Sequence, residues 1–340
     1  SIIPCGVDTA LFTPCPGGRR EAIGRLRTLL ERKIAKNPQG KTALLRREFG
    51  EALTGVESDE GFRTLVGDIR GQYNERHPDV DVADTLERID WDHGRIVLFV
   101  GKYLWSKGLQ LIISAVPFIL RRVPEAQFVF VGFGESREAL EAMVWALERG
   151  EKRVFYYALA ALLWGHQPDE STKAMDMFRK LLEAGREKRY FELAKKEALA
   201  SRVSFTGVFD HEELGCLLPC ADVLAAPSIF TEAFGMVAIE ALSSGVWPVL
   251  THTSGLREIN DILEQELAAE VGAIRKLEVG KDIITNLAQK TARILKSPRF
   301  ARPAVREKLR KIALERFSWQ AVAEKYLEHA GKLSAGAVVE

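Results

Sequence analysis

Two glutamates, Glu232 and Glu240, flank the apolar part of the stretch TEAFGMVAIEAL (231–242), which carries no other charge. We expect a helix to begin near Gly235, with Glu232 in the loop before it and Glu240 one to two turns inside it. The N-terminus of a helix offers unpaired N–H groups and a partial positive charge, both of which suit a phosphate. A carboxylate can accept hydrogen bonds from vicinal hydroxyls. The spacing therefore favours a diphosphate site with a ribose on Glu240 and another sugar on Glu232. The simpler alternative is that one acid is placed near the helix N-terminus because the helix dipole favours it, and that the other is a solvated surface residue.

Two lysines could add positive charge to such a site. Lys102 and Lys107 bracket the loop GKYLWSKG (101–108), which Gly101 allows to turn sharply. A second loop, GFGE (132–135), is rich in glycine but lacks the full spacing of a dinucleotide-binding motif. Taken singly, each lysine reads as a solvated surface residue, so only their convergence on one edge would give them a role.

The elements that must position these residues alternate along the chain. Short apolar runs rich in Val and Ile are each followed by a helical pattern, which is typical of a parallel sheet covered on both faces. Right-handed crossovers make such a sheet doubly wound, and its ligands bind beyond the carboxyl ends of the strands. We therefore predict an α/β fold with a doubly wound, Rossmann-like parallel sheet whose strands lie near 95–101, 127–134, 203–207, 222–228 and 247–251.

The ordered set of motifs resembles glycosyltransferase family 4, of the GT-B fold. The carriers of the resemblance are GKYLWSKG, GFGE, VSFTG, ADVLAAPS, TEAFGMVAIEAL, SGVWPVLT and SGLREI, with IIPCGVDTALFTP (2–14) similar to the family's interdomain linker and FSWQAVAEKY (317–326) to its terminal helix. Glu232 and Glu240 match the E-x7-E motif of retaining members. Cys5 and Ser254-Gly255 depart from the residues that are usual there, Asn and Gly-Gly.

The resemblance implies a binding site for a nucleotide-sugar donor, linked to UDP, GDP or ADP, with no metal and no other cofactor. Lys102 and Lys107 would neutralise the diphosphate, Glu240 would hold the ribose and Glu232 the transferred hexose. These enzymes retain anomeric configuration by attack on the front face, so Glu232 is not expected to be a nucleophile. The remaining donor-binding residues expected from the resemblance are Gly101, Gly134, Val208 beside the base, Phe234, Gly235, Met236 and Val237.

The same resemblance divides the chain into four parts: a linker at 1–15, a helical insertion at 16–94, the donor-binding domain at 95–143 and 202–335, and a second helical insertion at 144–201. Because the chain opens at Ser1 without an initiator Met, we expect a fragment. An N-terminal acceptor domain would then be missing, and the chain would bind donor without transferring it to an acceptor sugar, lipid or small molecule. The alternatives are a non-catalytic subunit that pairs with a separate acceptor-domain chain, and a helical scaffold that binds no nucleotide.

The first insertion has two halves of opposite charge. Residues 19–47 hold ten Lys and Arg against two acids, and 48–90 hold four Arg against twelve acids. An amphipathic basic helix could lie on a membrane surface. A helical hairpin whose halves attract each other is the interpretation we favour. In the second insertion, aromatic residues interleaved with Lys and Arg could stack on nucleic acid, but their spacing favours a small helical subdomain.

Composition excludes little else. The chain of 340 residues has 46% hydrophobic and 28% charged residues and a net charge of +1, which gives no general attraction to nucleic acid. Cys216 and Cys220 lie four apart among leucines, and we interpret them as core residues rather than metal ligands. We expect reduced thiols and a cytoplasmic protein, with the inner face of a membrane as a second location.

Overall fold

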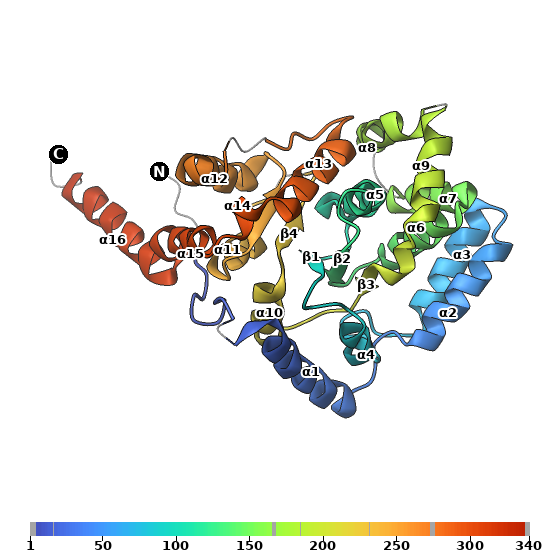
Figure 1. Ribbon diagram of the computed structural model, residues 1–340, viewed down its shortest axis with the longest axis horizontal. Coiled ribbons are helices and arrows are strands. Elements are labelled where there is room, and N and C mark those ends of the chain that lie inside the picture. The colour runs from blue at the N-terminus through green and yellow to red at the C-terminus, as the bar shows by residue number, and fades with distance from the viewer. Residues whose placement is uncertain are drawn as a thin grey trace.

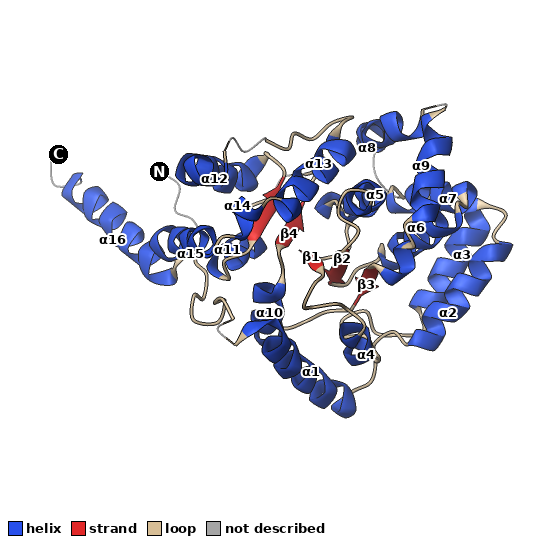
Figure 2. Ribbon diagram, viewed as in Figure 1, coloured by secondary structure: helices blue, strands red, loops and turns tan. Residues whose placement is uncertain are grey.

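The computed structural model describes residues 5–15, 17–164, 168–183, 185–230, 232–272 and 276–336. Its centre is a parallel sheet in the order β3-β2-β1-β4-β5, which confirms the predicted α/β class (Figures 1 and 2). Both neighbours of β1 run parallel to it, and β1 itself is buried along its length because its residues are almost all apolar. The strands are β1 (Arg95–Val100), β2 (Ala126–Val131), β3 (Val203–Phe205), β4 (Val223–Ala226) and β5 (Trp247–Leu250).

Helices cover both faces of this sheet. From β1 the chain moves outward through β2 to β3, then returns to β4 on the other side of β1. Right-handed crossovers therefore put the helices of the first three strands on one face and those that follow β3 on the other. The first set is α5 (Leu109–Leu120) and α6 (Arg137–Arg149), and the second is α10 (His211–Leu217) and α11 (Met236–Ser243).

The remaining C-terminal residues are helical, as predicted. α13 packs beside α5, and α15 packs on α11. The linker-like segment lies along this region, because Val7 N donates to Phe317 O at 2.7 Å; residues 1–4 of the predicted linker lie outside the described part. The helices are α12 (Ser254–Val271), α13 (Ile283–Lys296), α14 (Pro298–Ala301), α15 (Pro303–Phe317) and α16 (Trp319–Gly336), the last of which projects away from the body in Figure 1.

The first insertion is helical, and its basic and acidic halves attract each other as predicted, through Arg27–Glu87 at 3.3 Å and Arg46–Asp79 at 2.7 Å, but the two halves do not pack as one hairpin. Its basic helix α1 packs on α10 and α4, whereas α3 packs on α6 and α7 at the far side of the sheet (Figure 1). Lys33 of α1 pairs with Asp210 and Glu213, at 2.6 and 3.0 Å, so α1 is also bound to the α/β body. The helices are α1 (Gly18–Lys36), α2 (Ala43–Ala52), α3 (Asp59–Arg70) and α4 (Val82–Glu87).

The apolar face of α1 belongs to the core. Ile23, Leu26 and Leu30 are buried, with at most 5% of each side chain exposed. This packing removes the face that a membrane-surface helix would need, so that alternative is wrong for this structure. Within the described residues, no helix is long and apolar enough to cross a membrane.

The second insertion is also helical, and several of its aromatic residues form a core, whereas Trp164 is 60% exposed. Phe155 and Phe178 are fully buried, and the rings of Phe191 and Phe155 meet edge to face at 5.4 Å between centroids. Stacking of these rings on nucleic acid is therefore excluded. The helices are α7 (Lys152–Leu162), α8 (Pro168–Leu182) and α9 (Arg186–Lys196).

Candidate functional site

The loops that follow β1 and β4 meet where the strand order reverses. Ile229 N donates to Ser106 O at 2.8 Å, which joins the two loops. Gly108 stands at φ +76°, and a Cβ there would lie 2.1 Å from Pro227 O. Only glycine combines this backbone conformation with so close an approach. The junction lies at the topological switch point, the place where an open α/β sheet binds its ligands.

Lys107 and Glu232 form an ion pair at this junction. The ammonium of Lys107 lies 2.8 and 2.6 Å from the two carboxylate oxygens of Glu232. The hydroxyl of Ser228 donates to the same carboxylate at 3.0 Å. Both partners keep some exposure, 32% for Lys107 and 20% for Glu232. The pairing means that Lys107 orients Glu232 and that much of its charge is already matched.

The pair Ser254 and Gly255, which stands where Gly-Gly is usual, holds the backbone of Glu232. The hydroxyl of Ser254 lies 2.7 Å from Glu232 N and 2.9 Å from Glu232 O, and Gly255 N donates to Glu232 O at 3.1 Å. A Cβ on Gly255 would lie 2.7 Å from Ala233 O. The run of small residues at the start of α12 was the available signal for this contact.

The N-terminus of α11 faces the same edge. Gly235 precedes the helix at φ +84°, and Ala238 N bonds back to Gly235 O at 2.9 Å. In the described part of the chain, no acceptor reaches the N–H groups of Met236 and Val237, as expected for the first turn of a helix. Met236 is 38% exposed and Val237 is half-buried, so anions can reach this turn.

Glu240 lies inside α11 and is buried, with 7% of the residue exposed. Burial raises the pKa of its carboxyl, and the proximity of His211 offsets part of that shift. Among the described residues, no donor forms a hydrogen bond with this carboxylate. A buried carboxylate without donors is costly, so Glu240 is a candidate for ligand binding rather than for stability.

Lys102 and Gly134 lie on the neighbouring loops after β1 and β2. Gly101 N donates to Val131 O at 3.0 Å and Tyr103 N to Phe133 O at 2.6 Å, so the two loops run together. A Cβ on Gly134 would lie 2.8 Å from Tyr103 O, which explains the glycine. The Lys102 side chain between these contacts is exposed, and no acid of the described part pairs with it.

Two expected donor-binding residues lie differently from the rest. Phe234 is 8% exposed, and its ring packs against Phe317 at 5.8 Å, so its side chain serves the core. Val208 is half-buried after β3, where its N–H approaches His77 O at 3.4 Å. A segment of the first insertion thus lies beside the expected base position, which the sequence analysis did not foresee.

Cys216 and Cys220 form neither a reactive thiol site nor a metal site in the described part of the chain. Cys220 is buried, and burial raises its pKa to about 12, which keeps the thiol protonated. Within the described residues, no group of three or more His, Cys, Asp and Glu side chains is placed to hold a metal ion. Cys220 is buried and Cys216 is half-buried against the core, as expected for packing residues.

The junction of the two loops gives a stability prediction. Gly108→Ala should lower the free energy of unfolding by about 1–3 kcal/mol, because the new methyl group meets Pro227 O in a left-handed conformation. Urea denaturation would measure it. Gly24→Ala is the matched control, because Gly24 lies in α1 with no atom near its Cβ position. This variant should be slightly more stable than the wild type. Equal effects of the two substitutions would show that the junction is not tightly packed.

Residues 165–311 match the model of the family described as Glycosyl transferases group 1. The match includes Glu232, Glu240 and the start of α11, begins inside the predicted second insertion, and leaves Lys102 and Lys107 outside. The extents of the predicted linker and insertions stay predictions.

The chain is similar to several curated glycosyltransferases. It is 25% identical over 234 residues to an uncharacterized glycosyltransferase of Methanocaldococcus jannaschii, covering 69% of this chain and 44% of that one. It is 24% identical over 184 residues to the phosphatidyl-myo-inositol mannosyltransferase of Mycobacterium tuberculosis, covering 53% and 35%. The alignments thus span less than half the length of these relatives.

Solved structures show a weaker likeness. Sucrose-phosphate synthase from Thermosynechococcus elongatus has a TM-score of 0.44 and 25% identity, covering 77% of this chain and 50% of that one. Anabaena HepE in complex with UDP and glucose has a TM-score of 0.45 and 14% identity, covering 81% and 68%. The family match and the curated relatives thus show that residues 165–311 of this chain are similar to the family described as Glycosyl transferases group 1.

Proposed function

We propose that the sheet edge around Lys107 and Glu232 binds a nucleotide-sugar, and that the chain supplies the donor half of a retaining glycosyltransferase. The observation that carries this proposal is the Lys107–Glu232 pair at the switch point of the sheet, directly before the helix α11 that holds the buried Glu240. The N–H groups at the N-terminus of α11, which lies between the two acids in the chain, are available as hydrogen-bond donors.

Each group has a role that its chemistry suits. The diphosphate accepts hydrogen bonds from the first turn of α11 and is neutralised by Lys102, whose ammonium is exposed. Glu240 accepts hydrogen bonds from the ribose hydroxyls, which supply the donors that its buried carboxylate lacks in the protein. Glu232 accepts from the sugar that is transferred, while Lys107 and Ser228 hold its carboxylate in place.

Stabilisation of the leaving diphosphate would be the main catalytic contribution of this chain. Charge develops on the diphosphate as the glycosidic bond breaks, and cations with a helix N-terminus stabilise that charge without reorganising. We propose that no metal ion is needed, since Lys102 and the N-terminus of α11 supply the positive potential.

The substrate classes follow from the relatives. The names of those that match include phosphatidyl-myo-inositol mannosyltransferase, D-inositol 3-phosphate glycosyltransferase and mannosylfructose-phosphate synthase. Two of these names combine a glycosyl or mannosyl transferase with an inositol compound. We infer a UDP-, GDP- or ADP-linked hexose as donor and the hydroxyl of a sugar, lipid or small molecule as acceptor.

Transfer would also need an acceptor-binding domain opposite this edge, because the described residues hold one parallel sheet. The projecting α16 exposes Trp319, Tyr326 and Leu327, by 59%, 64% and 71%, and such a surface suits contact with another domain. We propose that this chain alone binds the donor and transfers nothing.

Calorimetric titration with UDP-, GDP- and ADP-linked glucose and mannose tests the proposal. At least one donor should bind, with an unchanged dissociation constant in the presence of EDTA. Absence of binding to the whole panel would refute the proposed function. Binding that EDTA abolishes would refute its metal-independent form.

A further inference from the structure

A segment of the first insertion crosses the carboxyl ends of β2 and β3. Pro78 forms an antiparallel bridge with Gly207, and Asp79 N donates to Thr206 O at 2.9 Å. Gly207 stands at φ +76°, and a Cβ there would lie 2.4 Å from His77 O. The insertion is therefore in direct backbone contact with the edge that carries the donor site.

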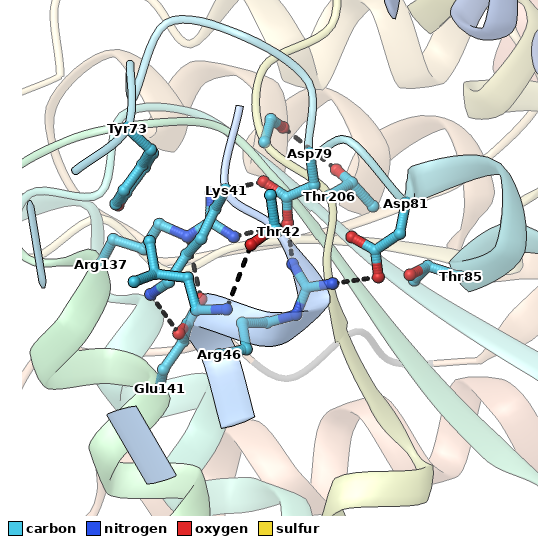
Figure 3. A network of polar contacts seen from close by, with 12 residues as sticks. Lys41, Thr42, Arg46, Tyr73, Asp79, Asp81, Thr85, Arg137, Glu141 and Thr206 are labelled. Atoms are coloured by element: carbon cyan, nitrogen blue, oxygen red, sulfur yellow. Dashed lines mark hydrogen bonds and ion pairs between the residues drawn. The ribbon is translucent and has the colours of Figure 1, made fainter. Parts of the chain in front are cut away.

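Buried charges hold this segment in place. The guanidinium of Arg137 binds Asp79 through two hydrogen bonds, of 2.8 and 2.6 Å, and Arg46 reaches the same carboxylate at 2.7 Å (Figure 3). Asp79 is fully buried and Arg137 is 1% exposed. A bidentate pair so fully desolvated accepts one geometry only, since any displacement leaves a charge unpaired.

The same network continues into α6. Lys41 lies 3.0 Å from Glu138 and 2.7 Å from Glu141, and the hydroxyl of Tyr73 donates to Glu138 at 2.7 Å. Burial alone would raise the pKa of Glu141, but Lys41 and Arg137 lower it to about 2. Lys41 and Tyr73, which precede the 76–79 segment, and Asp79 at its end are thus tied to the helix that follows the glycine loop 132–134.

This anchoring presents Arg76 to the glycine loop. The guanidinium of Arg76 lies 5.5 Å from the centroid of the Phe133 ring, within the range of a cation–π contact. The two acids beside it, Glu75 and Glu135, both contact Arg70, at 3.4 and 4.0 Å. Among the described residues, no carboxylate pairs with Arg76, and its side chain is exposed.

Lys102 approaches the same loop from β1. Tyr103 N donates to Phe133 O at 2.6 Å, which places Lys102 next to the residue that Arg76 covers. Two cations without acidic partners in the described part therefore flank one glycine-rich loop at the carboxyl edge. An anion that binds at this loop would be attracted by both cations.

We propose that Arg76 of the first insertion is a phosphate-binding residue of the donor site, acting with Lys102 across the loop 132–134. The inference rests on the proposed function for the identity of its ligand, a nucleoside diphosphate. Its chemistry is that of a guanidinium, which presents two parallel donors to phosphate oxygens. The insertion then completes the donor site in addition to packing on the sheet.

The test compares Arg76→Ala and Arg76→Lys with the wild-type chain. Ligands are inorganic pyrophosphate, the nucleotide-sugar that binds best, its nucleoside diphosphate and its nucleoside. Arg76→Ala should weaken the three phosphorylated ligands roughly tenfold or more and leave the nucleoside unchanged. Arg76→Lys should restore part of the affinity. Arg47→Ala is the control, because Arg47 is a 69% exposed arginine of α2 that faces Glu51.

The outcomes separate this inference from the proposed function. Unchanged affinity of Arg76→Ala for pyrophosphate and for the nucleotides would overturn the role of Arg76, whatever the donor does. Loss of pyrophosphate affinity in Arg76→Ala, in a chain that binds no nucleotide-sugar, would support the anion site and refute the proposed function. An equal loss for the nucleoside would also overturn the inference, because it would indicate a general disturbance of the edge.

Discussion

Replacing Arg137 with alanine should lower the free energy of unfolding by about 3–5 kcal/mol. The substitution leaves Asp79 fully buried with Arg46 as its one remaining cation, and it removes one of the two partners of Glu141. Desolvated carboxylates that lose a partner cost far more than an exposed ion pair contributes. Urea denaturation followed by circular dichroism would measure the change.

The loss of folding stability at low pH gives a second measurement of the effect of Arg137→Ala. The folded-state pKa of Glu141 is about 2, below its ordinary value of 4.5, so the carboxylate stabilises the fold above pH 4.5 and the contribution disappears as the pH falls towards 2. Arg137→Ala should bring this loss to higher pH. Arg149→Ala, on the same helix but 49% exposed, is the control and should change stability by less than about 1 kcal/mol. Equal losses in the two variants would show that the network does not anchor the insertion.

Glu240→Gln should stabilise the empty protein and weaken its binding of nucleotides. Burial raises the folded-state pKa of Glu240 above its value in the unfolded chain. The fold is therefore most stable at low pH, where the carboxyl is protonated, and it loses stability as the pH rises through the folded-state pKa. The amide avoids this cost. The melting temperature of Glu240→Gln should therefore exceed that of the wild type at pH 8 and equal it near pH 4.

The same substitution removes the charged acceptor from the ribose site. Loss of a charge-assisted hydrogen bond should weaken the binding of a nucleoside diphosphate by about 1–2 kcal/mol, roughly tenfold. A buried acid that costs stability and serves a ligand is expected at functional sites. Glu213→Gln on α10 is the control, because Glu213 is also buried but pairs with Lys33. If Glu240→Gln lowered stability at pH 8, Glu240 would be a structural residue.

The alternation of strand and helix was predictable because local signals agree with the final fold. RIVLFV is apolar at every position but its first, and the capping residue Asp210 with Glu213 marks the start of α10, where Asp210 N donates to Glu213 at 2.6 Å. Lys102, Lys107 and Glu232 were predicted as candidates because each lies on a loop that must follow a strand, and Glu240 because it lies in the helix that the last of these loops begins. Their convergence is a consequence of strand order, which a periodic pattern does not contain.

What escaped prediction depends on contacts between distant parts of the chain. Opposite charges in 19–47 and 48–90 suggested a hairpin, and Arg27 does pair with Glu87. Nothing in the pattern of charges indicated, however, that Lys33 pairs with Asp210 and Glu213, nearly 180 residues away. Arg76 carried no signal, because a single exposed arginine resembles any other until its neighbours are known. Phe234 was expected to contact donor, yet the apolar environment of Phe317 draws its ring inward.

The most direct test of the account compares Glu232→Gln and Glu240→Gln in calorimetric titrations at pH 8, each with a nucleotide-sugar and with the matching nucleoside diphosphate. If Glu232 holds the transferred sugar and Glu240 the ribose, Glu240→Gln should weaken both ligands by a similar factor. Glu232→Gln should weaken only the nucleotide-sugar. Wild-type affinity of both variants for both ligands would contradict the account, since the two acids that frame α11 would then touch neither sugar.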